Sequence, residues 1–112
     1  MARAFVVSEN QRHSYADLLS WAGELKSIFP PLAQVQLNPQ SALTHAREIL
    51  CDLSEDDYLV LVGDPVLIGI CMIVAAELHP AVHILKWDKI HSRYLPITID
   101  TSTEQRKDSN GL

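Results

Sequence analysis

The stretch YLVLVGDPVLIGICMIVAAEL, from Tyr58 to Leu78, decides the fold, because no other part of the sequence is as long and as apolar. Its length would be enough to cross a bilayer. A Gly-Asp-Pro sequence near its middle, however, would place the charge of Asp64 and a helix-breaking proline at the most costly depth of a membrane. Acidic residues at 55–57 precede the stretch, and no cluster of Lys or Arg flanks it. We therefore expect core elements of a globular protein and no membrane partner.

The stretch divides at Asp64 into a strand and a helix. Residues 58–62 form an unbroken apolar run, which is typical of a central strand that is covered on both faces. The Asp64 carboxylate can cap the following helix, and Pro65 suits the first helical position because the N–H it lacks would be unpaired there anyway. The helix is predicted to extend from Pro65 to about Leu78, where the His79-Pro80 pair ends it.

The predicted helix is apolar on nearly all sides. At 100° per residue, Val66, Ile70 and Ile73 lie within about 40° of Glu77. If Glu77 faces solvent, these three side chains have no polar cover, so another part of the chain or a second molecule must cover them. We expect Val66, Ile70 and Ile73 to form a self-association surface, most simply in a homodimer with two-fold symmetry.

Length and composition indicate one globular domain. The chain has 112 residues, of which 47% are hydrophobic and 21% charged, and this size is sufficient for an independent core. The formal net charge of -5 argues against a partner that is nucleic acid. The N-terminus lacks the pattern of a secretory signal, which predicts a cytoplasmic protein.

No arrangement of residues in the sequence predicts a metal or a cofactor. Cys51 and Cys71 have no Cys or His within three positions, so both are expected to be buried thiols that act as small apolar side chains. The five histidines lack the spacing of a helical metal site, and surface positions are expected for them.

The other elements follow from local patterns. In chain order we expect a strand over residues 4–7, a short helix capped by Ser14 and stopped by Gly23, a half-exposed strand over residues 24–29, a helix from Pro39 to about Leu53 capped by Asn38, and a hairpin of residues 81–87 and 94–100. Pro96 cannot donate to a strand ladder, which places the last strand at a sheet edge.

This order of elements predicts an α/β fold. A strand–helix–strand unit crosses over right-handed and places its strands parallel. We therefore expect a single small domain over residues 1–100, with a mixed sheet of about five strands, a parallel core, a C-terminal antiparallel hairpin and two main helices. Residues 101–112 are expected to be a disordered tail.

One candidate ligand site lies at the carboxyl ends of the parallel strands, where α/β sheets bind ligands. Gly63 and Asp64 would form its rim, together with Ser8, Glu9 and Asn10. The rim has one glycine where phosphate-binding fingerprints have two or three. Helix capping is therefore the favoured role for Asp64.

The hairpin offers a second candidate. Trp87, Asp88, Arg93 and Tyr94 combine aromatic and charged side chains, the types that dominate protein contacts. The alternative, which is the commoner case, is a cross-strand pair beside a solvated turn.

Three sequence segments carry a family resemblance. They are DYLVLVGDP at residues 57–65, ILKWD at 84–88 and RYLPITID at 93–100, with a weaker match in the GEL of residues 23–25. The combination resembles small α/β proteins of bacteriophages that have no assigned activity. This resemblance implies a phage accessory protein made in the host cytoplasm, and it transfers no catalytic residue.

These observations lead to a first hypothesis with two alternatives. The first is a non-enzymatic accessory protein that self-associates and binds or inhibits a host protein. The second is a small nucleotide-binding or hydrolytic protein that uses the Gly63-Asp64 rim, and the third is a structural component of the virion.

Overall fold

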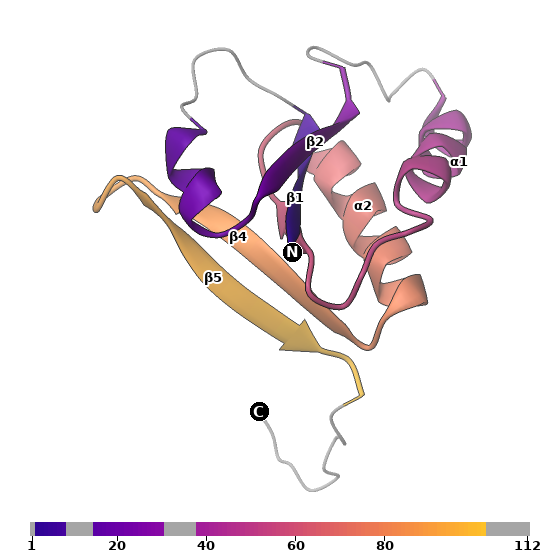
Figure 1. Cartoon of the computed structure of the whole chain (residues 1–112). Helices are drawn as coiled ribbons and strands as arrows, with labels where there is room; N and C mark the ends of the chain where they lie inside the picture. Colours follow the sequence, from indigo (N-terminus) through magenta and orange to yellow (C-terminus); the bar gives the residue numbers. More distant parts are fainter. Residues whose placement is uncertain (1, 9–14, 31–37, 103–112) are drawn as a thin grey trace, which may run out of the picture.

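The computed structural model describes residues 2–8, 15–30 and 38–102, and these residues form a five-stranded sheet with helices on both faces (Figure 1). The elements are β1 (Arg3–Ser8), the 3-10 helix η1 (Ala16–Ser20), β2 (Glu24–Phe29), α1 (Pro39–Ile49), β3 (Tyr58–Val60), α2 (Pro65–Leu78), β4 (Ala81–Asp88) and β5 (Arg93–Asp100). The strand order is β2-β1-β3-β4-β5. The first four strands are parallel, and β5 pairs antiparallel with β4. The predicted fold class is therefore confirmed.

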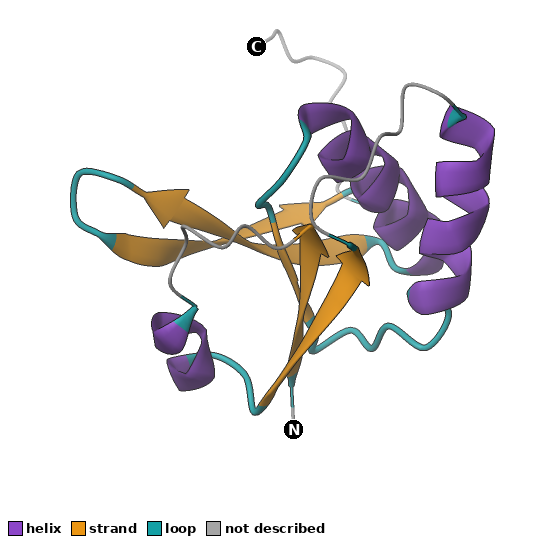
Figure 2. Ribbon diagram, turned by 90° about the horizontal axis from the view of Figure 1, so that it is seen from above, coloured by secondary structure: helices purple, strands orange, loops and turns teal. Residues whose placement is uncertain are grey.

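The sheet separates two apolar cores. Helices α1 and α2 lie side by side on one face, and η1 lies on the other (Figure 2). Successive side chains of a strand point to opposite faces, so Phe5 packs with the α1/α2 core while Val6 packs with the η1 core. In β3, likewise, Leu59 packs with the α1/α2 core and Val60 packs with the η1 core. This double burial explains the unbroken apolar run of the central strand.

Both main helices begin as the sequence predicts. The Asn38 side chain accepts a hydrogen bond from the backbone N–H of Ser41 at 3.0 Å, and Asp64 accepts one from Val66 at 2.7 Å. Each cap is followed by a proline at the first helical position. Helix α1 is shorter than predicted, however, because Leu50 leaves the helical conformation and its carbonyl accepts from the N–H of Leu53.

Two other boundaries also differ from the prediction. Strand β3 ends at Val60 rather than at residue 62, because the N–H of Val62 turns back to the carbonyl of Val60 at 3.0 Å. The short helix is a single 3-10 segment preceded by Tyr15, which makes no side-chain cap. Ser14, the predicted cap, lies outside the described residues, as does the tail beyond residue 102.

A buried ion pair joins the start of β1 to the turn before β3. One carboxylate oxygen of Asp57 accepts from the guanidinium of Arg3 at 2.8 Å and from the N–H of Ser54 at 2.8 Å, and the other accepts from the N–H of Arg3 at 2.8 Å. Only 2% of the Asp57 side chain is exposed. Burial alone would raise the pKa of Asp57, but these hydrogen bonds outweigh it and lower the pKa below its ordinary value.

Gly63 occupies a position that other residues fit poorly. Its φ is +130°, and a Cβ atom there would lie 2.8 Å from the Cβ of Ser8 in β1. We expect Gly63→Ala to lower the free energy of unfolding by about 2 kcal/mol or more, since backbone strain and a steric clash add. Gly69→Ala in α2 is the control: a Cβ there meets nothing within 4 Å, so the helix should gain about 0.5–1 kcal/mol. Denaturant unfolding of both variants checks the prediction, and equal effects would contradict it.

No helix of the described residues has the length and apolar content needed to cross a membrane.

Candidate functional site on helix α2

One side of α2 remains exposed although every residue of the helix except Glu77 is apolar. Leu67, Cys71 and Val74 are buried against the sheet. On the opposite side, the exposed fractions of Val66 and Ile73 are 55% and 56%, and Gly69 between them is also exposed. We call the surface formed by Val66, Gly69 and Ile73 the α2 face.

The third residue predicted for this surface lies differently. Ile70 is only partly exposed and packs against the core between α2 and the sheet. Glu77 faces solvent as expected, but it is not isolated: its carboxylate receives hydrogen bonds from the Arg47 guanidinium of α1 at 2.8 and 3.2 Å. The hydrogen bond from Arg47 lowers the pKa of Glu77. The only charged side chain of α2 is therefore neutralised by a partner on the neighbouring helix.

Strand β5 adds apolar surface at the edge of the sheet, next to β4, the strand that α2 contacts. Ile97 is paired with Ile84 and Ile99 with Val82, so both point to the face of the sheet that α1 and α2 cover. Figure 1 shows β5 at the edge of the sheet, with β4 between it and α2, and 39% of Ile97 and 43% of Ile99 are exposed. We call Ile97 and Ile99 the β5 strip. The sequence analysis placed the last strand at a sheet edge but did not include Ile97 and Ile99 in the predicted surface.

The rim at Gly63 and Asp64 serves the fold. One Asp64 oxygen accepts the N–H of Val66 in the helix cap, and Gly63 packs against Ser8. The Ser8 hydroxyl donates to the carbonyl of Pro30 at 3.0 Å. Glu9 and Asn10 lie outside the described residues. A ligand site at this rim remains a prediction from sequence.

The four hairpin residues form two cross-strand pairs. Trp87 is opposite Tyr94 with ring centroids 5.0 Å apart, and Asp88 is opposite Arg93. The Asp88 carboxylate, however, accepts from the N–H of Ile90 at 3.1 Å and lies 2.6 Å from Nδ1 of His91. The His91 hydrogen bond lowers the pKa of Asp88. Asp88 thus orders the turn.

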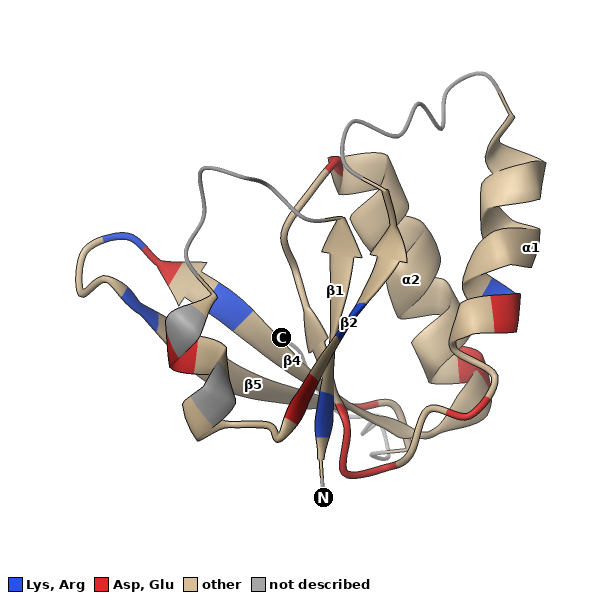
Figure 3. Cartoon of the chain, turned by 45° about the horizontal axis from the view of Figure 1, so that its top comes forward, with Lys and Arg blue, Asp and Glu red and all other residues tan. Residues whose placement is uncertain are grey.

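The hairpin tip combines apolar and cationic side chains. Ile90 is 85% exposed, the highest value among the large exposed hydrophobic side chains of the described residues. Lys86, Lys89 and Arg93 are also exposed, and none forms an ion pair with a described residue. Figure 3 shows several basic segments in the β4–β5 hairpin.

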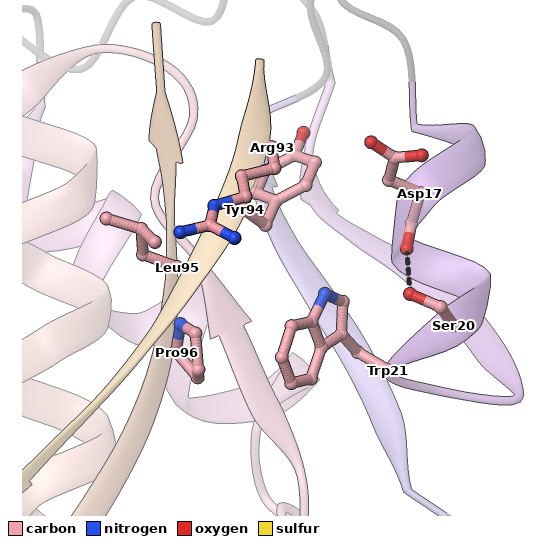
Figure 4. A pocket seen from close by; sticks show the side chains of 7 residues that line it. All are labelled: Asp17, Ser20, Trp21, Arg93, Tyr94, Leu95 and Pro96. Carbon is pink, nitrogen blue, oxygen red and sulfur yellow. Dashed lines mark hydrogen bonds between the residues drawn. The ribbon is translucent and has the colours of Figure 1, made fainter. Parts of the chain in front are cut away.

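A pocket of about 310 Å³ lies between η1 and the start of β5 (Figure 4). Asp17, Ser20 and Trp21 line one side, and residues 93–96 line the other. Burial raises the pKa of Tyr94 to about 12, with smaller contributions from Tyr15 and Asp17. The phenol therefore stays neutral at physiological pH. No local pattern predicts this pocket, because its two sides are more than 70 residues apart in the sequence.

Cysteine and histidine positions require two corrections. Cys71 is buried, and burial raises the pKa of its thiol to about 12, but Cys51 is exposed because α1 ends before it. His45 and His79 are half-buried rather than on the surface, and each hydrogen-bonds a backbone carbonyl. Within the described residues, no three His, Cys, Asp or Glu side chains are grouped as metal ligands.

Comparison with protein families gives one match. The model of the family described as Phage Pam3 gp32-like protein matches residues 2–101. The chain belongs to this family. Membership in the Phage Pam3 gp32-like family makes it a bacteriophage protein, as the sequence resemblance implied. No curated protein and no solved structure matches the chain.

Proposed function

We propose that this phage protein is a non-enzymatic interaction protein that self-associates through the α2 face. The observation that carries the proposal is the exposure of Val66 and Ile73 by more than half, on a helix whose other side is fully packed. Exposed apolar surface that is continuous along one element is typical of a contact site. The α2 face and the β5 strip together offer four large exposed aliphatic side chains for such a contact: Val66, Ile73, Ile97 and Ile99.

The chain itself provides a probe of self-association. Cys51 is an exposed thiol outside the α2 face, whereas Cys71 is buried and its pKa of about 12 keeps it unreactive. One sample labelled at Cys51 with a donor dye and one labelled with an acceptor should show energy transfer after mixing. Excess unlabelled protein should abolish the transfer. Absence of transfer at every concentration would contradict the proposal.

The hairpin tip suits a second partner, a host protein. The hairpin tip combines an exposed Ile90 on an ordered turn with Lys86, Lys89 and Arg93 nearby in sequence, the composition of an apolar anchor with a charged rim. Such an anchor fits an apolar pocket with acidic surroundings. We expect a host protein that is retained by the wild-type chain to be lost with Ile90→Ser and kept with Ile97→Ser, because Ile97 lies outside the tip. Equal retention by both variants would contradict this assignment.

A further inference from the structure

The shape of α2 restricts how another molecule can approach it. Gly69 lies at the middle of the α2 face, and, apart from its chain neighbours and the adjacent helix backbone, no atom of the described residues lies within 4 Å of the place where its Cβ would be. Val66 precedes it by three residues and Ile73 follows by four, so each lies one turn away on the same side of the helix. The helix thus carries a notch at Gly69 between two exposed aliphatic side chains. A second helix can approach the backbone most closely at this notch.

The distribution of charged residues favours a second copy of the chain as the partner of the α2 face. The chain has a formal net charge of -5, so two copies repel each other over most approaches. The α2 face is an exception, because it has no charged residue and because Glu77 beside it is paired with Arg47 (Figure 3). A two-fold contact presses the same patch of each subunit against itself, and any unpaired charge would meet its like. An uncharged apolar face meets this requirement.

We propose that two copies pair about a two-fold axis with their α2 helices crossing at Gly69. This inference rests on the self-association proposed above and adds its geometry. Ile73 of each copy packs beside Gly69 of the other. Ile97 and Ile99 lie on the same side of the sheet as α2 and are covered at the edge of the contact.

Filling the notch tests the crossing point without damaging the subunit. Gly69→Leu places a side chain in open space, and leucine favours helix more than glycine does. The subunit should therefore unfold at the same or a higher temperature. The dissociation constant of the pair should rise about tenfold or more, because the new leucine side chains occupy the space in which the two helices would cross. Ile99→Ser should weaken the pair less than Gly69→Leu. Ile90→Ser should leave the dissociation constant unchanged, although Ile90 is the more exposed residue.

The outcomes separate this inference from the proposed function. A Gly69→Leu chain that self-associates as well as the wild type would overturn the crossing at Gly69 and leave self-association standing. A wild-type chain that stays monomeric would overturn both. If Ile90→Ser weakens association as much as Ile99→Ser, the pairing is nonspecific hydrophobic association, and the proposed geometry is wrong.

A disulfide gives an independent readout of the same geometry. On a Cys51→Ser background, Gly69→Cys should form a covalent pair on mild oxidation, because residues at a two-fold crossing lie close enough for the bond. Ile90→Cys is the matched control at a more exposed position. Faster pairing at position 69 supports the crossing, and equal or slower pairing there would overturn it.

Discussion

Replacing Ile73 with Asp should convert the protein to monomers while leaving the subunit folded. The side chain is 56% exposed in the isolated subunit, so an aspartate there remains hydrated and costs little stability. In a two-fold contact two new carboxylates would be buried without partners, and a buried unpaired charge costs about 3–5 kcal/mol. The dissociation constant should therefore rise by at least about a hundredfold. Sedimentation equilibrium measures this change, and circular dichroism confirms that the fold is retained.

The matched control for this prediction is Ile90→Asp. Ile90 is more exposed than Ile73 but lies on the hairpin turn, away from the α2 face. Its substitution should leave the dissociation constant within about twofold of the wild-type value. An effect of Ile90→Asp as large as that of Ile73→Asp would show that net charge, rather than the α2 face, governs association.

The second large effect is expected at the buried ion pair. Asp57→Asn should lower the free energy of unfolding by about 2–3 kcal/mol, because the Arg3 guanidinium loses one of its two carboxylate partners and keeps only the exposed Asp52. Asp56→Asn is the control, since Asp56 is exposed in the same turn and forms no ion pair with a described residue. Urea unfolding at neutral pH measures both, and a similar loss for the two variants would contradict the assignment.

The same pair predicts how stability depends on pH. The pKa of Asp57 is lower in the folded protein than in the unfolded chain, where it is about 3.9. The unfolded state therefore binds the proton more readily. The stabilisation by the Asp57 carboxylate is complete at pH values above the pKa of Asp57 in the unfolded chain, and it is lost as the pH falls through the pKa of Asp57 in the folded protein. The difference in unfolding free energy between wild type and Asp57→Asn should shrink over this acidic range. A difference that stays constant down to pH 2 would refute the role of the carboxylate charge.

Local signals in the sequence located most of the elements. Asn38-Pro39 and Asp64-Pro65 each combine a capping side chain with a proline, and both helices begin there. Pro96 placed β5 at an edge of the sheet, where the structure has it. These signals depend on neighbours within a few residues, which the sequence lists directly.

The contacts that complete the site depend on pairs far apart in the chain. Arg47 and Glu77 are 30 residues apart, and their ion pair, which neutralises the edge of the α2 face, follows from the packing of α1 beside α2. The partial burial of Ile70 has the same origin, because helical periodicity gives the angle between residues but not the direction of the core. The hairpin could be predicted locally, but the packing of α2 on β4, next to the strand that carries the β5 strip, could not.

Self-association through the α2 face can be tested by the mass of the 112-residue chain in solution, measured by sedimentation velocity over a wide range of concentrations. One subunit has a mass of 12.5 kDa. Pairing through the α2 face predicts a species of twice 12.5 kDa that grows with concentration in the wild type and disappears in Ile73→Asp. A single species of 12.5 kDa at every concentration would contradict the account.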